Sequence, residues 1–467
     1  MNALKRMFNG TLGNILKFSA ATIISGIISF LTIPILTRLM TPEEYGQLNL
    51  FISTTNLLAI VISIGLLEYY LRFYYEHENE LGKLNFFCLG VGTINCIVVF
   101  FAIIVLCIPV MAGGDKLTNI FLGIVALGLY YMKIVSADAR YSSSFFKYTV
   151  VTVCSSVFFR TIAIPLAVLK VEYNFMIKIE SMLFLILAVI FIFTKGRKKY
   201  SFGIPSNFIK EIKFGILSWP AAMATYGNTY LTQRLIQKLT SYHELGIYNG
   251  TNVFIGIINI LQVGLKNFWS PFVYKNYEYN EKKIRVIQKY AMIVICMMAN
   301  LLIICRSIIY WLLGEDYLES KSFFAFVVTG AVIITAASLS GIGISIKCKG
   351  HINTGCMAML LGVNLLLLYF IVPHIGIAGA GIANLISSLL YYIVQTVLGQ
   401  RYYRTIECFW KEGISIGSMI ILSIANWYIE DDIYLAVFGM IVIGSVCVGY
   451  KKEFKVLIKD FLCKGNK

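Results

Sequence analysis

The sequence predicts an all-α polytopic membrane protein with about fourteen transmembrane helices. The 467-residue chain is 58% hydrophobic and only 14% charged, whereas a soluble chain carries about 25% charged residues. Apolar runs of about eighteen or more residues recur along its whole length, and each can cross a hydrocarbon core about 30 Å thick. Lysine and arginine gather in alternate loops, the charge pattern of a membrane protein with a fixed orientation. The number of runs excludes a soluble protein with a large helical core.

The apolar runs define the predicted spans in order. Their approximate limits are 15–37, 47–71, 85–111, 118–137, 148–169, 174–194, 214–237, 246–268, 288–313, 322–346, 354–372, 376–398, 413–428 and 433–450. The first run is a span and not a cleavable signal, because it is long, lacks a small-residue cleavage site and leads directly into another apolar run.

The basic residues assign the two sides of the membrane. About thirty of the 40 lysines and arginines lie on one side, in loops such as "KGRKKY" at 195–200 and "KNYEYNEKKIRVIQK" at 275–289. The loops of the other side, such as "TPEEYG" and "GEDYLES", are short and acidic or neutral. By the positive-inside rule both termini are cytoplasmic. We therefore expect a multi-pass protein of the cytoplasmic (inner) membrane.

Several function classes are excluded by what these loops and spans lack. The 11 cysteines form no CxxC pair and the 4 histidines are isolated, so we expect no disulfide framework and no metal site. There is no GxxxxGK[ST] phosphate loop and no HExxH, so we expect no cofactor and no catalytic residues. No outer loop exceeds about ten residues, which disfavours a membrane polymerase or ligase. The net charge of +16 reflects orientation, and no nucleic-acid partner is expected.

A faint internal repeat relates the first and seventh spans. The stretch "LTRLMTPEEYGQLN" at 36–49 is echoed by "HELGIYN" at 243–249, with Glu44, Gly46 and Asn49 matching residues 200 positions further on. Arg38 falls opposite Lys238 in the same alignment. A unit of six spans has an even number of crossings, so its copy keeps the same orientation. This predicts two six-helix lobes related by an axis along the membrane normal, an arrangement found in transporters.

The same stretch predicts a tight outer hairpin between the first two helices of each half. We expect Gly46 and Gly246 to supply backbone freedom there. Pro42 and Glu43 suit the first turn of the following helix, because proline needs no donor there and a carboxylate meets the positive end of the helix dipole.

Polar side chains form stripes on the first two helices of both halves. Steps of three and four place each set on one helix face. The members are Thr22, Ser25, Ser29 and Thr32; Asn49, Ser53, Asn56 and Ser63; Ser218, Thr225, Asn228 and Thr232; and Asn249, Asn252, Gly256 and Asn259. One such stripe is adequately explained as packing between helices. Four of them favour a shared hydrated cavity, which the asparagines line.

Cations inside the spans indicate an anionic cargo. Arg160 lies about twelve residues into its span, near the bilayer centre, where an unpaired arginine costs a few kcal/mol. Arg234, Arg306, Lys238, Lys266 and Arg38 complete the set of candidate cargo-binding cations. Snorkelling accounts for Lys238 and Lys266 at the span ends but not for Arg160. Arginine suits phosphate oxygens, which its planar fork can grip.

Acidic residues inside the predicted spans are few. Glu68, Asp138 and Glu180 are the candidates for ion coupling. Each is an alternative partner for a buried cation, and Glu180 in particular could pair with Arg160.

The chain resembles a known family at three places. The segments "KFSAATIISGIISFLTIPILTRLMTPEEYGQLNLF", "ELGIYNGTNVF" before "NFWSPFVYKNY", and "GIAGAGIAN" at 376–384 are similar to the polysaccharide-transport branch of the multidrug/oligosaccharidyl-lipid/polysaccharide (MOP) exporter superfamily, the Wzx-type flippases of O-antigen and capsule units. The resemblance covers the first twelve spans. It implies two six-helix lobes around a central cavity. The family pattern often has an Asp–Arg pair in the seventh span, where this chain has Gln233 before Arg234.

The resemblance also implies the organisation and activity of the chain. We expect an N-terminal lobe at 1–194, a basic linker at 195–213, a C-terminal lobe at 214–398, and two extra spans with a basic tail at 399–467. The implied activity is flipping of an undecaprenyl-pyrophosphate-linked oligosaccharide by alternating access, with an ion gradient or downstream consumption of the product as the driving force. Expected partners are this lipid-linked oligosaccharide, membrane lipid, a polysaccharide polymerase and a chain-length regulator. The alternatives are a drug/cation antiporter of the same superfamily and a membrane polysaccharide polymerase or ligase.

Overall fold

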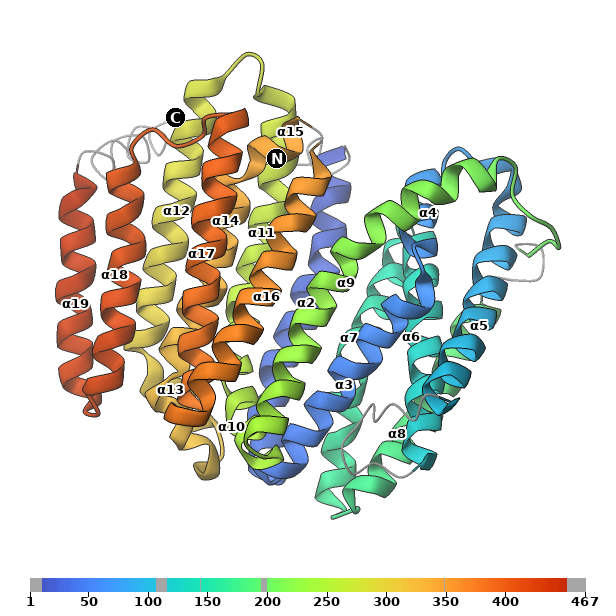
Figure 1. The fold of residues 1–467 in the computed structure, drawn as a ribbon, viewed down its shortest axis with the longest axis horizontal. Coiled ribbons are helices and arrows are strands. Elements are labelled where there is room, and N and C mark those ends of the chain that lie inside the picture. Colours follow the sequence, from blue (N-terminus) through green and yellow to red (C-terminus); the bar gives the residue numbers. More distant parts are fainter. Residues whose placement is uncertain (1–10, 106–115, 143, 195–199, 348, 452–467) are drawn as a thin grey trace, which may run out of the picture. The chain divides into compact units, whose positions relative to one another are not determined.

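The computed structural model describes residues 11–105, 116–142, 144–194, 200–347 and 349–451, and within them the regular structure is entirely helical (Figure 1). The chain divides into two compact units, Met1–Asn249 and Gly250–Lys467. The first unit therefore extends beyond the predicted end of the N-terminal lobe at 194. The lobe boundaries given above remain predictions.

The first unit consists of long helices joined by short connections. In order they are α2 (Thr11–Leu39), α3 (Pro42–Ser63), α4 (Leu66–Phe73), the 3-10 turn η1 (Glu78–Glu80), α5 (Leu81–Val105), α6 (Lys116–Tyr141), α7 (Phe145–Val168), α8 (Tyr173–Phe193), α9 (Phe208–Leu239) and α10 (Tyr242–Gly250).

The second unit has the same character. Its elements are α11 (Asn252–Asn276), α12 (Glu281–Ile304), α13 (Arg306–Leu312), the 3-10 segment η3 (Glu315–Ser322), α14 (Phe324–Ser340), α15 (Ile342–Ile346), α16 (Gly350–Ile375), α17 (Ala378–Tyr402), α18 (Phe409–Tyr428) and α19 (Asp432–Gly449).

The helices fit the predicted fold class, but the count of fourteen spans is not confirmed. In the part of the chain that the structure describes, nine helices are long and apolar enough to cross a membrane. The number rises to ten if η3 and α14, which meet at a bend of 64°, form one span. Some predicted spans are interrupted. The second is broken between α3 and α4, where Ile64 and Gly65 have φ values of +40° and +81°, and the ninth is broken between α12 and α13.

The hairpin between α2 and α3 is built by helix capping. Thr41 is the N-cap of α3: its hydroxyl accepts from the Glu44 amide at 3.3 Å, and the Glu44 carboxylate accepts from the Thr41 amide at 3.0 Å. This reciprocal capping box satisfies two of the amides that a helix start leaves open. Pro42 and Glu43 lie in the first turn, as predicted.

The role predicted for Gly46 and Gly246 is wrong, because both lie inside helices and neither needs unusual backbone angles. They instead permit close approach of α3 and α10. A Cβ on Gly46 would lie 2.3 Å from the carbonyl oxygen of Tyr242, and a Cβ on Gly246 would lie 1.8 Å from that of Pro42. The contact is reciprocal at the 200-residue spacing, since 42 and 242 are equivalent positions. A self-matching contact of this kind is what two-fold related segments make.

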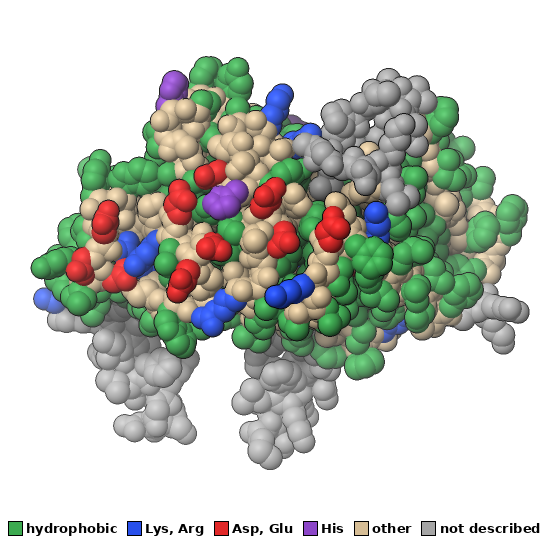
Figure 2. Space-filling model, turned by 90° about the horizontal axis from the view of Figure 1, so that it is seen from below, with side chains coloured by type: hydrophobic (Ala, Val, Ile, Leu, Met, Phe, Trp, Pro, Cys, Tyr) green, Lys and Arg blue, Asp and Glu red, His purple; other side chains and the backbone are tan. Residues whose placement is uncertain are grey.

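The two ends of the first unit carry different loops. At one end Leu39, Met40 and Glu44 line a pocket with Lys170 and Glu172. At the other end the Ser201 amide donates to the Gly82 carbonyl at 3.1 Å, and the Tyr141 hydroxyl donates to the Leu71 carbonyl at 2.8 Å. The connections thus alternate between the ends, as successive membrane crossings require. Figure 2 shows several acidic side chains on the face seen from below.

Candidate functional site

Arg160 lies near the middle of α7 and is the centre of the candidate site. Its guanidinium donates to the hydroxyl of Ser29 on α2 and, at 3.4 Å, to the side-chain oxygen of Asn49 on α3. Both partners belong to the polar stripes predicted from the sequence. The Arg160 side chain is only partly buried, and its Nε has no hydrogen-bond partner. Arg160 forms no ion pair with any carboxylate among the described residues, Glu180 included.

A second set of hydrogen bonds joins the stripes of α3, α9 and α10. The Ser53 hydroxyl donates to the Gln233 side-chain oxygen at 2.7 Å, and the Gln233 amide donates to the Asn249 side-chain oxygen at 3.1 Å. All three residues are at least nine-tenths buried. With Arg160, Ser29 and Asn49 they form what we call the polar seam of the first unit. Gln233 stands where the family pattern has a carboxylate, and here it serves as a neutral link.

The glycine contacts hold the helices of the seam close together. Gly46 is one turn before Asn49, and Gly246 is one turn before Asn249. Towards the other end of α3, the Trp219 indole of α9 donates to the Ile60 carbonyl at 2.7 Å. Close backbone approach through small residues is the usual way for membrane helices to pack. It brings the polar faces of α3, α9 and α10 within hydrogen-bond reach.

The other predicted cations of the first unit lie nearer its surface. Arg234 donates to the Gln237 side chain, one turn away on α9, at 2.7 Å. Lys238 and Arg38 are exposed at the ends of α9 and α2. The structure does not bring them into the polar seam. Of Lys266 only the backbone, within α11, is described.

The remaining predicted cavity asparagines are divided between the units. Asn56 bonds the Ile52 carbonyl of its own helix at 2.8 Å, as a packing residue would. Asn228 lies partly buried on α9. Asn252 and Asn259 belong to α11 in the second unit, where Asn252 is partly buried and Asn259 is exposed.

The three acidic candidates occupy different environments. Glu180 on α8 is completely buried, and neither carboxylate oxygen has a hydrogen-bond partner. Glu68 on α4 is partly buried and has one oxygen without a partner. Asp138 on α6 accepts from the hydroxyls of Tyr70 and Tyr74, both at 3.3 Å.

Sequence analysis missed one membrane-facing cation, Lys133. It was counted with the basic loop after the fourth span, but it lies inside α6, eight residues before the helix ends at Tyr141. Its ammonium group donates to the Tyr226 hydroxyl of α9 at 3.1 Å and lies 4.7 Å from the centre of that ring. The apolar pattern had already ended the span at 137, only four residues later, so its depth in the helix was the available signal.

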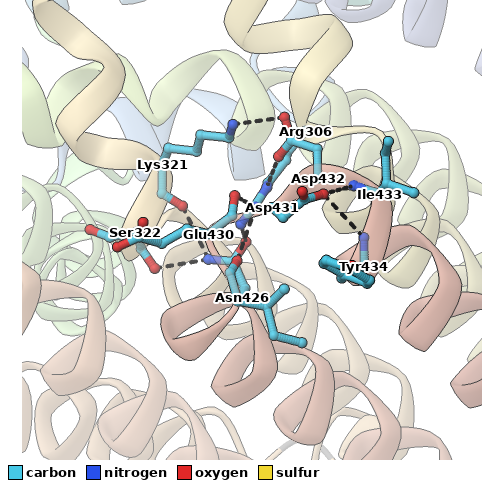
Figure 3. Close-up of polar contacts among 10 residues, drawn as sticks. Arg306, Lys321, Ser322, Asn426, Glu430, Asp431, Asp432, Ile433 and Tyr434 are labelled. Atoms are coloured by element: carbon cyan, nitrogen blue, oxygen red, sulfur yellow. Dashed lines mark hydrogen bonds and ion pairs between the residues drawn. The ribbon is translucent and has the colours of Figure 1, made fainter.

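Arg306 has a structural role in the second unit, which does not support its assignment as a cargo-binding cation. It is 1% exposed. Figure 3 shows it beneath the turn between α18 and α19, where its Nε donates to Asp432 at 2.6 Å and a terminal nitrogen donates to Asn426 at 2.7 Å. Another nitrogen donates to the carbonyls of Ile429 and Glu430, at 3.0 and 2.6 Å. Lys321 donates to the second oxygen of Asp432 at 2.8 Å. The sequence could not show this network, because its acid follows 126 residues later.

Comparison with solved structures defines the class of protein. The fold is similar to that of "Lipid II flippase MurJ, inward closed conformation", with a TM-score of 0.69 at 14% identity over 94% of this chain and 99% of the other. It is also similar to "Crystal structure of MATE in the bent conformation", with a TM-score of 0.53 at 14% identity over 90% and 98% of the two chains. The protein therefore has the all-helical, flippase-like transporter fold of the MOP superfamily, and the predicted fold class is confirmed.

Sequence comparison gives the family. The family described as "Polysaccharide biosynthesis protein" matches residues 35–322, and the chain belongs to it. A curated relative, "Capsular polysaccharide biosynthesis protein CapF" of Staphylococcus aureus, is 21% identical over 391 residues, which cover 80% of this chain and 95% of the relative. The resemblance to the polysaccharide-transport branch is thereby confirmed. The protein is a multi-pass membrane protein of polysaccharide biosynthesis.

Proposed function

We propose that this protein flips an undecaprenyl-pyrophosphate-linked oligosaccharide repeat unit, of O-antigen or capsule, across the cytoplasmic membrane by alternating access. The family membership and the flippase-like fold support a lipid-linked oligosaccharide as cargo. No cofactor is part of the proposal. The driving force is an ion gradient or consumption of the product, with Glu180, Glu68 and Asp138 as candidates for ion coupling. A polysaccharide polymerase and a chain-length regulator are the proposed partners downstream.

The observation that carries this proposal is the state of Arg160. The guanidinium lies in a membrane helix, is partly exposed, and is held by a hydroxyl and an amide oxygen in the absence of a described carboxylate. An arginine in this position costs at least about 2.5–3.5 kcal/mol unless an anion or water compensates it. Neutral hydrogen bonds fix its direction and leave its charge available. A pyrophosphate supplies the missing negative charge, and its oxygens match the donor geometry of the guanidinium.

The test replaces this charge and follows both transport and protein amount. We expect Arg160→Ala to abolish surface polysaccharide at a normal protein level, and Arg160→Lys to restore it only in part, because an ammonium lacks the planar fork. Arg234→Ala should have a smaller effect of the same kind. The matched control is Arg72→Ala, which removes an exposed arginine paired with Glu76. The decisive measurement is lipid-linked sugar accumulating in the inner leaflet.

Two outcomes would contradict the role of Arg160. If Arg160→Ala lowers protein abundance and Arg160→Gln restores both abundance and transport, Arg160 is a packing residue. If alanine at Arg160 and at Arg234 both leave flipping intact, the cationic mechanism is wrong for this chain.

The orientation of the chain belongs to the same proposal. The excess of basic residues in alternate loops supports cytoplasmic termini. Alkaline phosphatase fused after Gly114, Glu244 or Glu319 should be active, because the enzyme folds only outside the cytoplasm. Fusions after Lys199, Lys283 or Arg404 should be silent. Activity at position 199 would reverse the assigned orientation.

A further inference from the structure

A pocket of about 400 Å³ lies at the end of the first unit away from the α2–α3 hairpin. It is formed where α4, α5 and α6 meet, and it shares no residue with the polar seam. Its principal lining residues are Tyr74, Tyr75, Glu78, Asn85, Asp138 and Tyr141. The orientation proposed above places this end in the cytoplasm.

Three tyrosine rings form one wall of the pocket. Tyr74 and Tyr141 are stacked with their ring centres 4.9 Å apart. Tyr75 stands edge-on to both, at 5.6 and 5.3 Å. The Tyr75 side chain is 64% exposed, so it stands at the mouth of the pocket. Aromatic faces carry a partial negative charge and attract cations.

A fixed carboxylate forms the floor. Asp138 is only 3% exposed. It accepts hydrogen bonds from Tyr70 and Tyr74, and the Tyr70 hydroxyl also donates to Asn85 at 2.7 Å. These contacts hold the carboxylate in one position at the base of the aromatic wall. No lysine or arginine is among the described residues that line the pocket.

The sequence around the mouth departs from the charge pattern of this side of the membrane. The segment "YYEHENE" at 74–80 is acidic, although the other loops on this side are basic. Glu76 is paired with Arg72 and Glu80 with Lys83, both at 2.9 Å. Glu78 is exposed, lines the pocket and has no ion pair within the described part of the chain. The positive-inside rule does not account for an acidic aromatic pocket here.

We propose that this pocket binds an alkylammonium or guanidinium group. The cation would lie against the tyrosine rings, with Asp138 below it and Glu78 at the mouth. Rings and carboxylates together select a cation over a neutral or anionic group, since a cation–π contact contributes about 0.5–2 kcal/mol depending on desolvation. The group could come from a free polyamine or from a basic side chain of a cytoplasmic protein. The site is separate from the cargo site, so the proposal does not depend on the function proposed above.

Binding can be measured calorimetrically on the full chain in nanodiscs of zwitterionic lipid. The probes are spermidine, for a free polyamine, and a tri-lysine peptide blocked at both ends, for a protein-borne group. We expect saturable binding of at least one probe, weakened about tenfold by Tyr75→Ala and by Glu78→Gln, in line with the loss of a cation–π contact or a charge. Both side chains are exposed, so the variants should fold. Glu76→Gln is the matched control, because Glu76 lies in the same segment but outside the pocket.

The probes separate the two sources of the cation. Binding of spermidine alone supports a free polyamine, and tighter binding of the peptide supports a partner protein. The proposal fails if neither probe binds, or if Glu76→Gln weakens binding as much as Glu78→Gln, because the attraction would then be a general effect of the acidic segment.

Discussion

Arg160 and Arg306 are both arginines in membrane-embedded parts of this protein, but their surroundings are opposite. Arg306 is 1% exposed and donates to a carboxylate, an amide and two carbonyls at the α18–α19 turn. Arg160 is partly exposed and has two neutral partners. From sequence alone the two looked alike, as cations in apolar runs. The difference shows that the charge of a membrane arginine is informative about function only when the protein leaves it uncompensated.

The contrast also separates stability from transport. Removing Arg306 leaves Asp432 and several carbonyls without partners in a buried place, which is costly for folding. Removing Arg160 relieves the first unit of a charge that the protein itself does not neutralise. The two substitutions should therefore affect different measurements.

The largest expected effect tests the structural half of this contrast. Arg306→Ala should lower stability by about 3–5 kcal/mol, the usual cost of removing one partner of a buried ion pair. We expect a sharp fall in protein abundance and in the thermal unfolding temperature in detergent. The variant Lys321→Ala, which removes the more exposed partner of Asp432, is the control and should cost much less. Normal abundance of Arg306→Ala would remove the distinction between the two arginines.

A smaller effect is expected where the backbone holds the polar seam together. Gly46→Val inserts a side chain where even a Cβ would lie 2.3 Å from a backbone oxygen. Overpacking of this kind costs about 1–3 kcal/mol, and displacement of α3 would carry Asn49 away from Arg160. We expect lower thermal stability and lower transport together. In Gly90→Val the new Cβ meets nothing within 4 Å, and equal tolerance of the two changes would contradict the role of the contact.

The smallest effect makes Arg160 resemble Arg306. Asn49→Asp places a carboxylate at the position that accepts from Arg160 at 3.4 Å. Protein abundance should hold, because an opposite charge is added beside a cation. Transport should fall, since a competing interaction of about 1.4 kcal/mol lowers affinity for an anion about tenfold. The assay is inner-leaflet accumulation of lipid-linked sugar, with Asn56→Asp as the control. Undiminished flipping in Asn49→Asp would mean that the free charge of Arg160 is not used.

Much of the fold could be predicted because the bilayer imposes its own pattern on the sequence. Apolar length gave the helices, and the residues Thr41, Pro42 and Glu44 marked the start of α3. The polar stripes were also visible, since helical spacing places Ser29 or Asn49 on a face without knowledge of its neighbour. These are local properties, and a single sequence carries them.

The partners of these residues could not be predicted, because they depend on distant segments. Asp432 is 126 residues from Arg306, and Gln233 is 180 residues from Ser53. The role of Gly46 was misjudged for the same reason. A glycine beside a turn suggests backbone freedom, whereas the neighbour that requires its small size is an echo of the same motif 200 residues away.

The extent of the first compact unit has a consequence for how the protein is made. Its core includes α9 and α10, with Gly65 of the α3–α4 break so close to α9 that a Cβ there would lie 2.4 Å from the backbone of Gly215. A nascent chain that has emerged from the ribosome only as far as the sixth predicted span lacks both helices. The inserted N-terminal helices must then wait in the lipid with the α3 contact surface uncovered until residue 249 has been synthesised. Release of the chain at 194 should yield a fragment that membrane proteases degrade, whereas release after 249 should yield a persistent one.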